Sequence, residues 1–294
     1  MNNTCKISIV IISYNQEDVI RRTIDSIIRQ KNFVHEIVIS DDASSDKTWN
    51  IINEYREKYS LLIRSFRNKS NQGIYGNLES TRSKVTGDLI FTIAGDDVFN
   101  DGLFERAIKL TKNNIISLSE DYLVYFDYQS IDVNGEIKKY SNRALKKHDS
   151  LYLKLRNKIA NRTLGMSRSV WDKHYKLERE EGISVNEEGI FDLQPHLFAK
   201  QVYYEEFIGQ TYYAGIGVSN NLDRSIYNLS KIKYCDTVID LLAERQKVEH
   251  LLWMHLYKVK LVIKYDRSKL INTVYNFFKF WLSKNILNNN KSFN

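Results

Sequence analysis

Short apolar runs rich in β-branched residues alternate with segments of helical periodicity over residues 6–94 of this 294-residue chain. The runs of strand length lie at 6–13, 35–40, 61–66 and 88–94. Apolar residues recur at helical spacing within 16–30, 46–59 and 75–85. Strands that alternate with helices of this length pair in parallel, and helices cover both faces of their sheet. The sequence therefore predicts an α/β fold with a mostly parallel sheet flanked by helices.

The chain beyond residue 100 has a less regular pattern. Residues 122–137 are typical of two strands joined by a turn at Asn134 and Gly135. Helical periodicity returns near 144–158 and then dominates a long C-terminal tail.

Three features bear on the compartment. Residues 1–16 lack the basic and apolar regions of a secretion signal. No run reaches the roughly 18 apolar residues of a membrane span. The two cysteines, Cys5 and Cys235, are far apart and show no CxxC spacing, which suits a reducing compartment. We expect a cytoplasmic protein.

The net charge of +7 is concentrated in the tail. Residues 228–294 contain 12 Lys or Arg and 5 Asp or Glu, so they carry the whole excess and residues 1–227 sum to zero. A nucleic-acid site needs its own basic cluster, which argues against such a site in the main body. Aromatic residues are interleaved with lysines in this tail, and such a composition suits two interpretations. It forms a peripheral contact with an anionic membrane, or it packs on the main domain or on the second subunit of a homodimer.

Polar clusters follow three of the predicted strands. They lie at 13–15, 41–46 and 95–97, and the last contains the adjacent carboxylates of Asp96 and Asp97. Ligands of parallel sheets bind beyond the carboxyl ends of the strands, so these clusters are expected at one edge. The loop after the first strand contains no glycine, which argues against a nicotinamide cofactor.

Four segments, "ISIVIISYN", "EIVISDDASSDKT", "NQGIYGN" and "GDLIFTIAGDD", together resemble the glycosyltransferases of family 2 in order and spacing. The resemblance is strong over about 6–105 and weaker over 160–220. It implies a GT-A (Rossmann-like) fold and an inverting enzyme that uses a nucleotide sugar. We expect a catalytic domain over 1–220, with a nucleotide-binding half up to about 100 and an acceptor half after it. A basic, mostly helical extension over 221–294 follows.

The resemblance also implies which residues bind the donor. Asp97 would ligate Mn²⁺ or Mg²⁺, because a hard cation bound by carboxylates neutralises a diphosphate leaving group. The implied nucleotide-sugar-binding residues are Ser13, Tyr14, Asn15, Asp41, Asp42, Asn71, Gly73, Asn77 and Asp96. Among them, Asp96 would face the ribose, and a carboxylate of Asp41 or Asp42 would accept from the imide of uracil. The same residue types also suit turns and helix caps.

A general base is expected about 90 residues after the metal motif, where the family has Glu-Asp. Here Glu187 and Glu188 stand in that place, so Glu188 falls where Asp is usual and Gln194 where Arg is usual. Glutamate can act as a base, but the longer side chain leaves Glu187 and Asp192 as rivals of Glu188. A charged start of a helix is the alternative.

The resulting prediction is a glycosyltransferase that moves a sugar, most simply from a UDP-sugar, to a glycan or lipid-linked acceptor. Such an enzyme would serve the synthesis of a surface polysaccharide such as capsule or lipopolysaccharide. A sugar-nucleotide pyrophosphorylase is one alternative, although it usually has a glycine-rich loop after the first strand. A catalytically inactive GT-A module that binds glycans is another.

Overall fold

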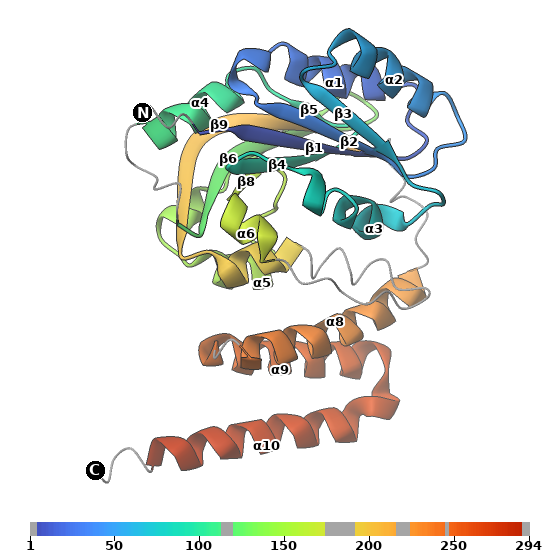
Figure 1. Cartoon of the computed structure of the whole chain (residues 1–294). Helices are drawn as coiled ribbons and strands as arrows, with labels where there is room; N and C mark the ends of the chain where they lie inside the picture. The colour runs from blue at the N-terminus through green and yellow to red at the C-terminus, as the bar shows by residue number, and fades with distance from the viewer. Residues whose placement is uncertain (1–4, 113–119, 174–191, 216–223, 245–246, 290–294) are drawn as a thin grey trace. The chain divides into compact units, whose positions relative to one another are not determined.

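The computed structural model describes residues 5–112, 120–173, 192–215, 224–244 and 247–289. These residues fall into two compact units (Figure 1). The first unit holds the described residues up to 215, and the second holds those from 224 onward.

The N-terminal half of the first unit is a parallel sheet. Its strands are β1 (Ile7–Ser13), β2 (Glu36–Asp41), β3 (Ile63–Arg67) and β4 (Leu89–Ala94). They lie in the order β3-β2-β1-β4, and each neighbouring pair is parallel. All four strands are those predicted from the sequence.

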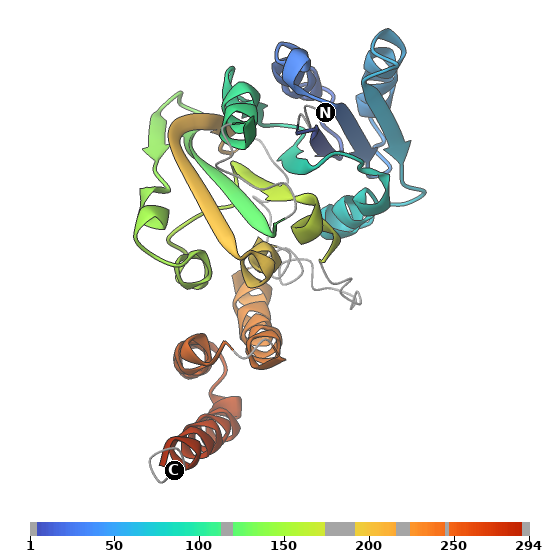
Figure 2. The ribbon, with the colours of Figure 1, turned by 60° about the vertical axis from the view of Figure 1, so that its left-hand side comes forward.

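Helices cover both faces of this sheet (Figure 1 and Figure 2). On one face, α1 (Ile20–Ile28) and α2 (Thr48–Lys58) pack against one set of alternate strand residues, such as Ile9 and Ile39. On the other face, α3 (Gly73–Glu79) packs against the other set, such as Val10. Because strand side chains alternate between faces, the β-branched runs supply both cores.

The predicted third helix has different bounds. It begins two residues earlier, at Gly73, and ends at Glu79, and a separate 3₁₀ turn takes Arg82–Lys84.

The second half of the first unit extends the same sheet. Its elements are β5 (Val98–Phe99), α4 (Leu103–Lys112), β6 (Tyr122–Ile131), β7 (Ile137–Tyr140), α5 (Ser150–Leu155), β8 (Leu164–Ser167), α6 (Arg168–Asp172) and β9 (Gln201–Tyr213). The strand order continues from β4 through β8, β6 and β9 to β5, and β7 pairs with β6. β8 is antiparallel to β4, whereas β6 and β9 are parallel to each other.

The predicted hairpin is present as β6 and β7, which are antiparallel. Gly135 in its turn has φ +80°, a left-handed conformation that glycine adopts at no steric cost.

The second unit consists of helices, as predicted for the tail. They are α8 (Arg224–Glu244), α9 (Val248–Tyr265) and α10 (Leu270–Asn289). One side of α10 packs on α9, where the His255 ring lies 4.9 Å from that of Phe280. Within the part of the chain that the structure describes, no helix is both long enough and apolar enough to span a bilayer.

Candidate active site

The loops after β1 and β2 are joined by hydrogen bonds. The Asn15 backbone N–H donates to Ser44 Oγ at 2.9 Å, and the Ser45 N–H donates to Asn15 Oδ1 at 2.8 Å. Asn15 itself has φ +49°, a left-handed conformation that asparagine tolerates better than most residues. These bonds bring the predicted residues Ser13, Tyr14 and Asn15 beside the Asp41 and Asp42 loop.

Asp41 and Asp42 are both buried, but their carboxylates have different partners. Asp41 accepts from the hydroxyl of Ser44 and pairs with Arg67 Nε at 3.1 Å. Burial raises the pKa of Asp41, and the bonds from Ser44 and the charge of Arg67 act in the opposite direction. Asp42 uses only Oδ1, which accepts from Asn68 Nδ2 and from a backbone N–H, both at 2.8 Å. Since Asp42 Oδ2 has no hydrogen-bond partner within the described ranges, Asp42 is the better acceptor for a ligand N–H.

The Asn71, Gly73 and Asn77 group has intramolecular partners. Asn71 Oδ1 accepts from the Gly73 N–H at 2.9 Å, which forms a local turn, and Gly73 has φ +72°. Asn77 is buried, and its Nδ2 lies 3.1 Å from the Ser40 carbonyl and 3.4 Å from the Ser13 carbonyl. Asn77 therefore joins the ends of β1 and β2. A direct role of these three residues in ligand binding stays a prediction.

Asp96 and Asp97 follow β4 after Gly95 and are almost fully buried. Asp97 Oδ1 accepts from the Tyr213 N–H at 3.1 Å, and Oδ2 accepts from Gln210 Nε2 at 3.0 Å. From α1, Arg22 donates to the Asp96 carbonyl at 2.7 Å. β9 and α1 therefore both hold the segment that contains Asp96 and Asp97 in place.

Two arginines flank this pair, each stacked on a tyrosine of β9. Arg162 Nη1 lies 3.5 Å from Asp97 Oδ2, and Arg162 Cζ lies 3.4 Å from the centre of the Tyr212 ring. Arg22 Cζ lies 3.5 Å from the centre of the Tyr213 ring. Its Nε is buried without a hydrogen-bond partner in the described chain. Stacking on an aromatic face holds a guanidinium in place while its N–H groups stay available.

The two arginines do not fully offset the effect of burial on the pKa values of Asp96 and Asp97. Burial raises the pKa of Asp97 to about 7, the negative charge of Asp96 adds to the increase, and Arg162 opposes it. Burial also raises the pKa of Asp96, against the charges of Arg162 and Arg22. A further positive charge next to the pair would favour its ionised form.

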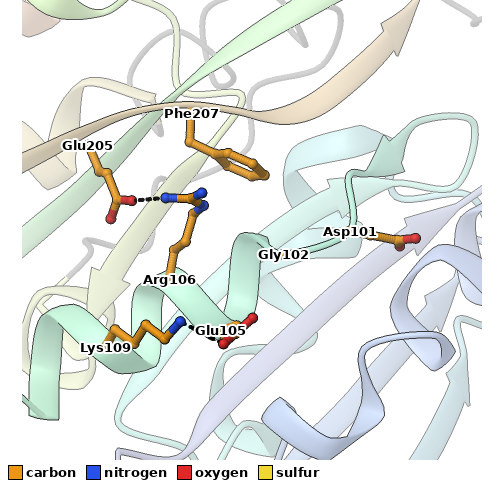
Figure 3. A pocket seen from close by; sticks show the side chains of 7 residues that line it. All are labelled: Asp101, Gly102, Glu105, Arg106, Lys109, Glu205 and Phe207. Atoms are coloured by element: carbon orange, nitrogen blue, oxygen red, sulfur yellow. Dashed lines mark hydrogen bonds and ion pairs between the residues drawn. The ribbon is translucent and has the colours of Figure 1, made fainter.

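A second feature, a surface pocket of 220 Å³, lies between α4 and β9 (Figure 3). Its charged groups offset one another: Arg106 pairs with Glu205 and Lys109 with Glu105 at 2.7 Å. No residue predicted from the sequence lines this pocket. It is therefore separate from the candidate site.

The sequence model of glycosyl transferase family 2 matches residues 8–168. The chain belongs to this family. The matched segment runs from β1 through β8 and contains the Asp96 and Asp97 pair. The family membership predicted from the four sequence segments is confirmed.

Two curated relatives each match part of this chain. An uncharacterized protein of Mycobacterium tuberculosis is 40% identical over 97 residues, which are 33% of this chain and 28% of that protein. The UDP-Glc:alpha-D-GlcNAc-diphosphoundecaprenol beta-1,3-glucosyltransferase WfaP of Escherichia coli is 29% identical over 124 residues, 42% of this chain and 45% of WfaP. The chain thus spans less than half the length of either relative.

A solved structure shares the fold over most of the chain. S. aureus TarS 1-349 in complex with UDP-GlcNAc superposes with a TM-score of 0.67 at 17% identity. The match covers 94% of this chain and 81% of that chain. With the mostly parallel sheet and its flanking helices, this likeness confirms the predicted GT-A fold.

The donor set of the carboxylate pair fits the divalent cation that the family implies. Hard cations such as Mg²⁺ prefer carboxylate oxygens and take few protein ligands, because phosphate oxygens and water complete their shell. The buried carboxyl group of Asp97 has a raised pKa, and a bound cation would lower that pKa. Nowhere in the described residues, this pair included, do three His, Cys, Asp or Glu side chains gather in an arrangement that could hold a metal, so the protein ligands there would be the two carboxylates.

The predicted general base, Glu188, and its rival Glu187 lie outside the described residues. The other rival, Asp192, is described. Its half-exposed carboxylate pairs with Lys154 Nζ at 3.1 Å, and its carbonyl accepts from Asn161 Nδ2 at 2.6 Å. The same Asn161 bonds the buried His196 ring at 3.1 Å. Asp192 is therefore joined to α5 and to the segment between α5 and β8, and its carboxylate is already engaged as an ion-pair partner.

The sequence interpretation missed the residues that contact the carboxylate pair from elsewhere in the chain. They are Arg22, Arg162, Gln210, Tyr212 and Tyr213. None belongs to a short motif, and Gln210 contacts Asp97 across 113 positions of sequence. The one local signal was that side chains two positions apart in a strand point to the same face, which puts Gln210 and Tyr212 of β9 on one face.

Proposed function

We propose that this glycosyltransferase transfers a sugar from a UDP-sugar to a glycan or lipid-linked acceptor, with inversion, in the synthesis of a surface polysaccharide. The observation that carries the proposal is the buried Asp97 carboxylate at the end of β4, fixed by β9 and flanked by Arg162 and Arg22. Two similarities support the choice of substrates. The TarS structure contains UDP-GlcNAc, and the name of WfaP gives UDP-Glc as donor and a diphosphoundecaprenol-linked sugar as acceptor.

The donor would bind along the carboxyl ends of β1, β2 and β4. Asp42 Oδ2 would accept from the imide N–H of uracil, next to Tyr14, and Asp96 would face the ribose. A Mn²⁺ or Mg²⁺ ion held by Asp97 would neutralise the diphosphate as it leaves. Arg162 would donate to the same phosphate oxygens, because arginine suits phosphate recognition.

In the transfer step, Glu188 would act as the general base. An acceptor hydroxyl oxygen attacks the anomeric carbon from the side opposite the diphosphate. As the new C–O bond forms, the bond from the anomeric carbon to the phosphate oxygen breaks, and its electron pair leaves with UDP. The hydroxyl proton passes to the carboxylate of Glu188. One displacement of this kind inverts the anomeric configuration.

Hydrolysis of a panel of UDP-sugars tests the proposal. We expect slow release of UDP from one of them with Mn²⁺ or Mg²⁺, and none with a chelator. Pyrophosphate-dependent formation of UTP instead of UDP would identify a sugar-nucleotide pyrophosphorylase. Failure to bind or hydrolyse any nucleotide sugar, together with binding of glycans, would identify the inactive module. Either result overturns the transferase proposal.

We also propose that the helical tail contacts the anionic inner face of the cytoplasmic membrane. Residues on the outer side of α10 at positions i, i+4, i+7 and i+10 remain exposed: Ile271, Tyr275, Phe278 and Trp281. Their exposed fractions run from 47% to 86%. Exposed lysines, including Lys269 and Lys279, accompany them. An apolar and aromatic stripe with basic residues suits the interface of an anionic bilayer, and a lipid-linked acceptor would be found there.

A further inference from the structure

The pairing of three strands places three side chains in one row that ends at Asp97. Tyr140 of β7 lies opposite Tyr128 of β6, and Tyr128 lies opposite Gln210 of β9. Residues paired across neighbouring strands point to the same face of the sheet. At the end of the row, Gln210 donates to Asp97. The row therefore leads from the edge of the sheet to the candidate metal carboxylate.

Three tyrosines lie along this row or next to it. The rings of Tyr128 and Tyr140 stack with centres 4.7 Å apart and planes within 6° of parallel. Tyr140 is 40% exposed, and Tyr128 is half-buried. Tyr212, two residues after Gln210 on β9, points to the same face and carries the guanidinium of Arg162. Tyr128, Tyr140 and Tyr212 are called the aromatic platform below.

We propose that the aromatic platform binds a sugar ring of the acceptor. A sugar presents C–H groups on the face of its ring and hydroxyls around its edge. The stacked Tyr128 and Tyr140 rings turn one face toward each other, so a sugar would pack its C–H groups on the exposed part of Tyr140, while a few polar groups fix the orientation. Arg162 supplies such a donor at the end of the platform nearest Asp97.

The position of the platform fits an acceptor rather than a donor. The donor loops lie at the ends of β1, β2 and β4, whereas the platform lies on β6, β7 and β9. Neighbouring strands are about 4.8 Å apart, so Tyr128 and Tyr140 stand one and two strand spacings from Gln210. A sugar on these rings would have its hydroxyls near a diphosphate bound at Asp97. This inference rests on the proposed function, because it assigns the acceptor of the same reaction.

A purely structural role is the alternative, since cross-strand aromatic pairs also stabilise hairpins. The chain offers a matched control. Ile137 lies on the same strand as Tyr140 and is 54% exposed. It points to the opposite face, because three positions separate the two residues. Truncation of Ile137 weakens the hairpin edge without touching the platform.

Saturation-transfer NMR with methyl β-glycosides of glucose, galactose and N-acetylglucosamine tests the inference on the full chain. We expect at least one glycoside to receive saturation at its ring C–H protons in the wild type and in Ile137→Ala. The signal should fall at least fivefold in Tyr140→Ala and remain in Tyr128→Phe, which keeps the ring. A wild type without signal for any glycoside overturns the platform. So does an unchanged signal in Tyr140→Ala, or an equal loss in Ile137→Ala.

Donor hydrolysis without acceptor separates this inference from the proposed function. Tyr140→Ala should hydrolyse the UDP-sugar at the wild-type rate, because Tyr140 does not belong to the donor site. If the wild type hydrolyses the donor but Tyr140→Ala keeps its glycoside signal, the platform alone is wrong. If glycoside binding depends on Tyr140 but no UDP-sugar is hydrolysed, the proposed function fails and the platform stands as a glycan-binding surface.

Discussion

Gln210 donates a 3.0 Å hydrogen bond to Asp97 across 113 positions of sequence. The bond joins the last strand of the sheet to the carboxylate that follows β4. The neighbouring Tyr213 N–H occupies the other oxygen of the same carboxylate. The half of the domain expected to bind the acceptor therefore contacts the metal-binding residue predicted for the donor half.

Replacement of Asp97 by Asn will abolish metal-dependent donor binding. The substitution removes the charge that faces the cation, while the amide still fills the buried position. Calorimetric titration of UDP against the protein with Mn²⁺ measures the effect. Asp101→Asn is the control, because Asp101 is an exposed carboxylate four residues away that pairs with Arg29. Donor affinity that keeps its metal dependence in Asp97→Asn would disprove the assignment.

Binding of Mn²⁺ alone will depend on pH around neutrality. The pKa of Asp97 is raised to about 7, so the carboxyl is mostly protonated at pH 6 and mostly ionised at pH 8. Because the metal needs the ionised form, affinity should be about tenfold weaker at pH 6 than at pH 8. The electron paramagnetic resonance signal of free Mn²⁺ reports the bound fraction. Equal affinity at the two pH values would contradict the prediction.

Replacement of Arg162 by Gln will weaken UDP binding about tenfold or more, the usual loss for a hydrogen bond to a charged group. It will also shift the acidic limb of the pH profile of donor hydrolysis to higher pH. The reason is that Arg162 lowers the pKa of Asp97, so its removal raises that pKa. Arg143→Gln, an exposed arginine paired with Glu206 in the same unit, should change neither quantity. A profile that stays in place would show that Arg162 does not act on Asp97.

Replacement of Glu188 by Gln will leave donor binding nearly intact and lower transfer about 10²- to 10⁴-fold, the usual range for loss of a general base. Glu187→Gln and Asp192→Asn are the comparison variants. Asp192→Asn should have a small effect, because its carboxylate already pairs with Lys154. If one of the comparison variants is the inactive one, that residue is the base in place of Glu188.

A substitution in the exposed stripe of α10, which contains Phe278, will show whether the tail binds a membrane. Phe278→Glu should abolish co-sedimentation with vesicles that contain anionic lipid, and added salt should release the wild type, because salt screens the basic residues. Thr273→Ser on the buried side of α10 is the control. A wild type that ignores vesicles at low salt, and that changes from dimer to monomer in Phe278→Glu, would identify the stripe as a homodimer interface instead.

The sequence by itself determined the parallel half of the fold and one edge of the site. β-branched runs and helical spacing are local properties of the chain, and they predicted β1 to β4 with the helices between them. The carboxyl ends of parallel strands must lie at one edge, so the loops that begin at Ser13, Asp41 and Asp96 were expected together. Boundaries were less accurate: the third helix begins at Gly73 and ends at Glu79.

Only the tertiary structure decided which side chains complete the site. Asp41 and Asp42 are equivalent in the sequence. In the structure, Ser44 and Arg67 bind the carboxylate of Asp41, whereas one oxygen of the Asp42 carboxylate has no partner in the described chain.

The approach of Gln210 to Asp97 depends on the register of β9, whose pairing with β6 spans about 80 residues, and Arg162 stacks on Tyr212 of the same strand. No local pattern encodes such a register, because it is set by the packing of both faces of the sheet at once.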